Sequence, residues 1–198
     1  FNGTGKLTTA IGSLNDVAAS IIQQADGKLV VAGYRNNGSN DDFALVRYNS
    51  DGSLDTTFNV TGKLTTAIGA SHDQVYSVIQ QADGKLAAAG SSSNGSNYDF
   101  ALVRYNSNGT LDTTFNSTGK LTMAISVDDQ AYSMLQQADG KLVVAGNSYN
   151  GVNSDFALVR VNSNGTLDTT FDTDGKLLTN IALASQAQAR AVIQQADG

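Results

Sequence analysis

The stretch DFALVRYNSNGTLDTTFN, from Asp99 to Asn116, decides the fold because the chain contains it three times in nearly the same form. Residues 42–59 read DFALVRYNSDGSLDTTFN, and residues 155–172 read DFALVRVNSNGTLDTTFD. A second string, QQADGK or its beginning, recurs with its Asp at positions 26, 83, 139 and 197. A fixed period of about 57 residues is the signature of a repeat architecture. The 198 residues are therefore predicted to be a single repeat array, with units 1–57, 58–114 and 115–170 and a partial unit 171–198.

Each unit is predicted to contain four short strands. In the second copy, KLTTAI (residues 63–68) alternates polar and apolar residues, as a half-buried strand does. QVYSVIQQ follows, and Asp83-Gly84 then supplies the tight turn of a hairpin whose second strand is KLAAAG. A polar loop leads to DFALVRY and to a second turn signal, NSNG. No stretch has an uninterrupted helical period, so the chain is predicted to be all-β.

Four antiparallel strands in a unit of this length are typical of a β-propeller blade. LVVAG and FALVR are apolar on both faces, which is expected when a blade is packed between two neighbours. A β-solenoid is the alternative, although its rungs are usually shorter. We therefore expect about three and a half blades, with strands at residues 6–11, 17–24, 28–34, 42–48, 63–68, 74–81, 85–90, 99–105, 120–125, 130–137, 141–147, 155–161, 176–181 and 188–195.

The skeleton DGK…AG…DFAL.R.N..G.LD..F...GK runs through every copy and resembles the delta-60 repeat family of bacterial proteins. The resemblance covers essentially the whole chain. One departure is the turn QADGK, in which the family commonly has proline in place of the alanine. The resemblance implies a β-propeller, often in secreted or surface-exposed bacterial proteins, with no established catalytic activity. It carries over no catalytic residues.

Composition excludes several classes of function. The net charge of −6 argues against nucleic acid or an anionic membrane as a partner, because both require a basic surface. No apolar run approaches the roughly 20 residues of a membrane-spanning helix, so membrane insertion is not expected. The first residues already belong to the repeat, so no signal peptide is expected within the chain.

Residue types that carry catalysis or bind metals are scarce. The chain has one His and no Cys or Glu, which excludes thiol nucleophiles and zinc sites of the His/Cys type. The Asn/Asp-rich turns NSDGSLD and FDTDGK offer oxygen atoms, but the full calcium-loop pattern is missing and turn chemistry explains them. We expect a protein that is not an enzyme and needs no metal or cofactor.

The repeated Arg47, Arg104 and Arg160 have two interpretations. They could form a ring that binds anions, or each could form a structural ion pair or carbonyl clamp with a nearby carboxylate such as Asp99 or Asp112. Burying an unpaired arginine would cost several kcal/mol. The recurrence of each Arg together with its Asp neighbours favours the structural interpretation.

Differences between copies gather in two loops, the one before the QQ strand and the one before DFALVR. In an up-and-down sheet alternate turns lie at the same end, so both loops are predicted to share one face. Loops on a rigid scaffold often carry binding. An alternative is that exposed loops vary because nothing constrains them. The candidate contact residues are Asp16, His72, Asp73 and Asp129 in the first loop set, and Tyr34, Arg35, Tyr98 and Tyr149 in the second.

Three functions follow as hypotheses. The first is a binding scaffold, outside the cell or on the surface of a bacterium, for a glycan or a protein. The second is a purely structural repeat that self-associates, and an enzyme is the third and weakest. The QQ strand is expected to line the propeller axis, which leaves an outer strand at 1–11 and an inner strand at 188–196 without blades of their own. Open blades expose unpaired edges and apolar faces, so we expect an oligomer or a longer parent chain.

Overall fold

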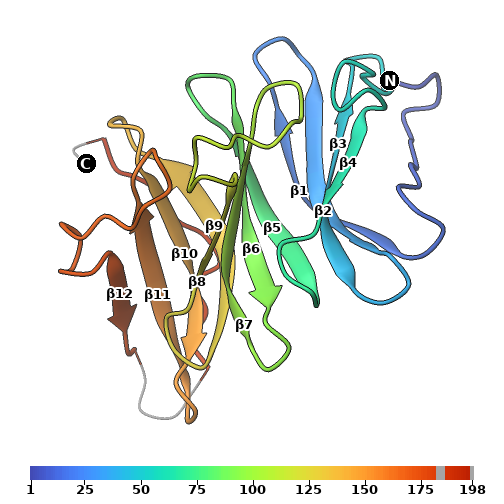
Figure 1. Ribbon diagram of the computed structural model, residues 1–198. Coiled ribbons are helices and arrows are strands. Elements are labelled where there is room, and N and C mark those ends of the chain that lie inside the picture. The colour runs from blue at the N-terminus through green and yellow to red at the C-terminus, as the bar shows by residue number, and fades with distance from the viewer. Residues whose placement is uncertain (182–185, 197–198) are drawn as a thin grey trace.

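The computed structural model describes residues 1–181 and 186–196, and its regular structure in that part is entirely β. The strands form three separate four-stranded antiparallel sheets, each of which is one blade (Figure 1). Blade 1 contains β1 (Asp16–Gln23), β2 (Leu29–Asn36), β3 (Asp41–Tyr48) and β4 (Lys63–Thr66). Blade 2 contains β5 (Asp73–Gln80), β6 (Leu86–Ser93), β7 (Tyr98–Tyr105) and β8 (Lys120–Met123). Blade 3 contains β9 (Asp128–Gln136), β10 (Leu142–Tyr149), β11 (Ser154–Val161) and β12 (Lys176–Thr179).

Within each blade the strands are hydrogen-bonded in chain order, which confirms the predicted four-strand antiparallel unit. The short fourth strand of each blade comes from the start of the following repeat unit. The first strands, β1, β5 and β9, contact one another along the row of blades. The QQ strand is therefore innermost, as the sequence predicts, and the GKL strand is outermost.

A bulge in each innermost strand is made possible by a glycine on its neighbour. In blade 2 the register shifts between Val75 and Ser77, and Gly90 is the partner of Val75. A β-carbon on Gly90 would lie 2.7 Å from the Cα of Val75, closer than real contacts allow. The glycine in the repeated AG thus permits the backbones to approach, and the extra residue of the bulge is left unpaired.

Apolar side chains from facing blades make the core, so the sheets pack face to face. One cluster joins Val30, Phe43 and Leu45 of blade 1 to Leu86 and Val103 of blade 2. A second cluster of the same kind joins blade 2 to blade 3. These repeated apolar positions are buried almost completely, which explains why LVVAG and FALVR carry apolar residues on both faces.

Two predicted strands do not form. Residues 6–11 and 188–195 have no strand pairing, although they lie against the outer blades. The first segment keeps repeat-like contacts: Lys63 Nζ donates to the carbonyl of Ala10 at 2.6 Å, as Lys120 does to Ala67 at 2.7 Å. What it lacks is a third strand, equivalent to β3, to accept its ladder hydrogen bonds. The segment lies where the repeat places its fourth strand, but it forms no strand because no adjacent strand is present to pair with it.

Candidate functional site: the variable-loop face

The antiparallel order separates the connections of each blade into two ends. The QADGK turns and the long connections from the third to the fourth strand share one end, the upper one in Figure 1, which we call the repeated-turn end. The other end carries the remaining connections. We call it the variable-loop face, and it consists of residues 12–15, 37–40, 67–72, 94–97, 124–127 and 150–153 together with the first half of the innermost strands β1, β5 and β9, which begin there.

At the repeated-turn end, Arg104 joins two blades. Its Nε donates to Asp112 Oδ2 at 2.7 Å, its guanidinium lies 4.7 Å from the centre of the Phe115 ring, and its Nη1 donates to the carbonyl of Ser163 in the next blade. Arg47 makes the same contacts one blade earlier, with Asp55 at 2.7 Å. The ion-pair interpretation of these arginines is confirmed, and the partner is the Asp of LDTTF.

The carboxylate of this pair is strongly held in its charged form. Burial alone would raise the pKa of Asp112, but the hydroxyl and amide of Thr114, together with Lys85 and Arg104, outweigh burial and lower that pKa to about 2. Lys85 Nζ lies 3.2 Å from Asp112 Oδ2. The repeated-turn end is therefore a set of closed polar clusters that hold the blades together.

On the variable-loop face, three of the expected contact residues turn inward. Asp16, Asp73 and Asp129 each accept the backbone amide of the isoleucine four or five residues earlier, at 2.7 to 2.8 Å. Asp73 and Asp129 are 0% exposed, and burial raises the pKa of both carboxyls. These two carboxyls therefore lie beneath the surface, and their role as contact residues stays a prediction. The clamp also explains why β4 ends at Thr66, since the next amides turn toward Asp73.

His72 and Tyr98 lie where loops of neighbouring blades meet. The amide of Asp41 donates to His72 Nδ1 at 3.2 Å, and the His72 side chain is 43% exposed. Nδ1 is also 3.2 Å from Asp41 Oδ2, so the imidazole ring lies beside this carboxylate. The amide of Tyr98 donates to Asp128 Oδ1 at 2.8 Å, one blade farther on.

The other three expected residues lie in the second strands of blades 1 and 3. Tyr34 and Arg35 are in β2, where the Arg35 guanidinium lies against Gly12, and both side chains are half-buried. Tyr149 ends β10, and its carbonyl accepts the amide of Val127 at 3.0 Å. Burial raises the pKa of Tyr76 to about 12, and Tyr34, Tyr132 and Tyr98 add to this shift, which places these tyrosines near one another.

Tyr76 and Tyr132, the centre of this group, were not among the predicted contact residues. Each is the unpaired residue of a bulge in an innermost strand, and their ring centres are 5.5 Å apart. The guanidinium of Arg190 lies 4.1 Å from the centre of the Tyr132 ring. The sequence held a signal: this position reads Ala19, Tyr76, Tyr132 and Arg190 in successive copies, beside a serine that three of the copies share.

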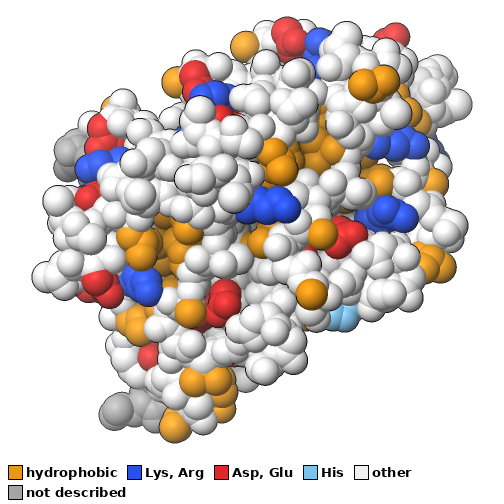
Figure 2. Space-filling model, viewed as in Figure 1, with side chains coloured by type: hydrophobic (Ala, Val, Ile, Leu, Met, Phe, Trp, Pro, Cys, Tyr) orange, Lys and Arg blue, Asp and Glu red, His pale blue; other side chains and the backbone are white. Residues whose placement is uncertain are grey.

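Metal-binding groups and charge are sparse in the part of the chain that the structure describes. No three His, Cys, Asp or Glu side chains gather there as a metal-binding group. Acidic and basic side chains are scattered over the face shown in Figure 2, without a continuous patch of either sign. Among the same residues no helix is both long and apolar enough to cross a membrane.

Comparison with known proteins places the chain in a family. The family model described as "Domain of unknown function (DUF5122) beta-propeller" matches residues 24–58, 81–115 and 137–171, which together are just over half of the chain. Each match runs from the end of an innermost strand to the Phe that follows LDTT, so it includes the arginine cluster. No curated protein matches the chain. The chain therefore belongs to the DUF5122 beta-propeller family, whose function is unknown.

Proposed function

We propose that this protein is a non-catalytic binding module that uses its variable-loop face to hold a glycan. The observation that carries the proposal is the pair of tyrosine rings, Tyr76 and Tyr132, presented 5.5 Å apart by neighbouring innermost strands. Rings of this kind offer a rigid amphipathic surface at low cost in conformational entropy. The resemblance to delta-60 repeats supports a non-catalytic module and a location outside the cell or on a bacterial surface.

The loops around the tyrosines are held before any ligand arrives. Asn40 Nδ2 donates across the blade boundary to the carbonyl of Ala70 at 3.0 Å. Gln74 Nε2 donates to Asp41 Oδ2 at 2.9 Å, and the Tyr76 hydroxyl donates to Gln74 Oε1 at 2.6 Å. A framework fixed in this way lowers the entropy lost on binding.

The polar groups suit sugar hydroxyls better than other ligands. The amide oxygens of Gln74 and Gln130 accept hydrogen bonds from the hydroxyls of Tyr76 and Tyr132, and a few polar groups beside an apolar surface are typical of small-molecule sites. With a net charge of −6 the chain is a poor partner for a polyanion. Tyr76, with its pKa near 12, stays neutral at physiological pH and does not act as a base.

A glycan array probed with the wild-type protein and Tyr132→Ala tests the proposal, in buffers with and without calcium. We expect wild-type binding to one class of glycan and at least a tenfold loss in Tyr132→Ala. Asp83→Asn, at the repeated-turn end, is the matched control and should bind like wild type. An array without signal, or equal signals from wild type and Tyr132→Ala, would contradict the proposal.

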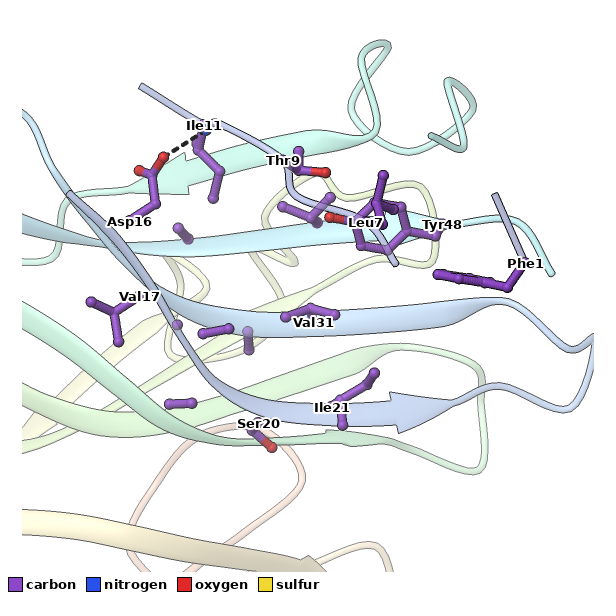
Figure 3. A pocket seen from close by; sticks show the side chains of 16 residues that line it. Phe1, Leu7, Thr9, Ile11, Asp16, Val17, Ser20, Ile21, Val31 and Tyr48 are labelled. Carbon is purple, nitrogen blue, oxygen red and sulfur yellow. Dashed lines mark hydrogen bonds between the residues drawn. The ribbon is translucent and has the colours of Figure 1, made fainter. Parts of the chain in front are cut away.

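A second candidate function is self-association through the apolar faces of the end blades. Ile21 is 61% exposed on blade 1, whereas Val78, which occupies the same repeat position in blade 2, is 2% exposed because blade 1 covers it. Ile21 and Val31 line a groove of about 520 Å³ on this open face, with Tyr48 at its edge (Figure 3). On blade 3, Phe156 and Leu158 line a pocket on the opposite end face together with residues 188–193, which lie against that face without forming a strand.

The occupant we propose for these faces is a second copy of the chain. Phe43 and Leu45, the repeat equivalents of Phe156 and Leu158, already pack against blade 2 in the first core cluster. The two open faces are thus the two halves of an interface that the chain builds between its own blades. Association in this manner is head to tail, and each contact leaves one face free for the next copy.

A further inference from the structure

A row of three side chains crosses the first three strands of each blade, next to the variable-loop face. In blade 1 the strand register aligns Asp16 with Arg35, and Arg35 with Asp42. In blade 2 the same register aligns Asp73 with Ser92, and Ser92 with Asp99. Cross-strand partners project from the same face of a sheet. Blade 1 therefore has a cation between two carboxylates, and blade 2 has a serine there.

In blade 1 the guanidinium of Arg35 lies beside Gly12. A β-carbon on Gly12 would lie 3.1 Å from Cζ of Arg35 and 3.2 Å from its Nη2. Gly69 is the same position one repeat later. A β-carbon there would lie 3.2 Å from the Ser93 carbonyl oxygen, 3.3 Å from Ser92 Oγ and 3.9 Å from Asp73 Oδ1. Three oxygen atoms thus converge in blade 2 where blade 1 has its guanidinium.

Asp73 contributes a buried oxygen atom without a partner. The residue is 0% exposed, and its Oδ2 accepts the amides of Ile68 and Gly69 at 2.7 and 3.3 Å. Its Oδ1 has no hydrogen-bond partner among the residues that the structure describes. An unsatisfied buried acceptor destabilises the fold, and the cost is greater when the acceptor is charged. Burial raises the pKa of Asp73 and Asp42 adds to this rise, although the Ser92 hydroxyl and the amides of Ile68 and Gly69 oppose it.

We propose that blade 2 binds a calcium ion beside Gly69, in the place that the Arg35 guanidinium takes in blade 1. Asp73 Oδ1, Ser92 Oγ and the Ser93 carbonyl are the converging ligands, Asp99 adds a second carboxylate from β7, and water completes the shell. Calcium accepts six to eight such oxygen ligands in flexible geometry. Two carboxylates make a weak site, with a dissociation constant of about 10⁻⁴ to 10⁻³ M.

Blade 3 repeats the row as Asp129, Ser148 and Asp155 but differs from blade 2 at the loop beside it. Ser126 stands in the place of Gly69. Both carboxylate oxygens of Asp129 accept backbone amides, of Ile125 and Ser126. The proposed calcium site is therefore particular to blade 2, and it is separate from the Asn/Asp turns at the repeated-turn end.

Terbium luminescence excited through tyrosine tests the site directly, because Tb³⁺ replaces Ca²⁺ and the chain has no Trp. Tyr98 is near enough to Asp73 for that carboxyl to raise its pKa, so it can sensitise the ion. We expect terbium emission from the wild-type protein, displaced by millimolar Ca²⁺. Ser92→Arg, which recreates the arrangement of blade 1, should reduce the emission at least tenfold without lowering the melting temperature.

Two further variants keep the test decisive. Gly69→Ala fills the space with a methyl group and should also abolish emission, with circular dichroism showing that the fold persists. Asp51→Asn, in an exposed turn of the repeated-turn end, should leave emission unchanged. Absence of wild-type emission, or emission that survives both Ser92→Arg and Gly69→Ala, would overturn the proposal. Neither terbium emission nor circular dichroism depends on glycan binding, so these experiments test the calcium site independently of the proposed function.

Discussion

At the scale of single residues, the repeated arginine connects one blade to the next. Arg104 combines an ion pair to Asp112, a ring contact to Phe115 and a hydrogen bond to the carbonyl of Ser163 in the following blade. Both charged side chains are nearly buried, 6% and 4% exposed. Burying one charge without the other is expensive, which is why the Arg and its Asp recur together.

Arg104→Ala is expected to lower the free energy of unfolding by about 1.5–3 kcal/mol, since Asp112 loses a buried charged partner but keeps its contacts with Lys85 and Thr114. Arg160→Ala is the matched control. Its side chain is 22% exposed, compared with 6% for Arg104, so a smaller loss is expected. Denaturation by guanidinium chloride measures both. A loss for Arg104→Ala no greater than that for Arg160→Ala would contradict this account.

Acid should destabilise the protein through Asp112. Its pKa is lowered from the ordinary 3.8 to about 2, so the folded state binds the proton more weakly than the unfolded chain. The stabilisation is complete above about pH 4 and is lost as the pH falls toward 2. Asp73, with its raised pKa, has the opposite sign and destabilises the fold as the pH rises above 3.8.

Melting temperatures recorded between pH 5 and pH 2 check this prediction. Asp112→Asn should show a flatter pH dependence than wild type, whereas the exposed Asp83→Asn should keep the wild-type slope. Parallel curves for wild type and Asp112→Asn would show that Asp112 is not the group responsible.

At the scale of the elements, the connection from the third to the fourth strand is the most demanding segment of the blade. In blade 1, Asn59 and Val60 both have positive φ, 46° and 64°. The corresponding residues of the other two blades share this left-handed conformation. Asn adopts it readily, but a β-branched residue is strained there. Val60 is also 83% exposed, so packing of its side chain contributes little stability to offset this strain.

Val60→Gly is therefore expected to stabilise the protein by about 1 kcal/mol, because glycine adopts positive φ without steric cost. Val152→Gly is the control: that valine is 86% exposed in another loop and is not among the residues with positive φ. It should be neutral or destabilising. Equal effects in the two variants, read from denaturant midpoints, would exclude strain at Val60.

At the scale of the whole molecule, the three blades stand in a row with the two ends of the chain on opposite sides of it (Figure 1). Each internal boundary buries an apolar cluster, and the two outermost faces carry the same kinds of residue without a blade upon them. Exposed apolar side chains that lie together, such as Val17 and Ile21 on blade 1, are typical of interaction surfaces. The proposed head-to-tail association would cover them.

Light scattering of residues 1–198 tests this association. We expect a mass above the 20.6 kDa of one chain, and a shift toward that mass in Ile21→Asp, which places a charge on the open face of blade 1. Val60→Asp, a change of an exposed valine at the repeated-turn end, should associate like wild type. A stable soluble species of 20.6 kDa from the wild-type chain would refute the proposal.

Most of the fold could be predicted from the sequence, because its signals are local and occur in every copy. Asp83-Gly84 indicates a hairpin wherever it occurs, and alternating or wholly apolar segments indicate strands between neighbours. The exceptions are residues 6–11 and 188–195, which have the right pattern but lack partner strands. Local pattern selects a strand, whereas a ladder of hydrogen bonds needs a second segment at the right distance.

The candidate site depended on tertiary structure much more. The comparison of copies identified the variable loops, and the antiparallel order brings them to one end. It did not reveal that Asp73 is buried, nor that Tyr76 and Tyr132 stand together on neighbouring bulges. Residues 56 positions apart become neighbours only when the blades pack face to face. By itself the sequence determined the repeat, the strands and the arginine–aspartate pairing rule, because these are local or recur in each copy. Burial and contacts between copies were decided by the packing of the blades, which no single unit contains.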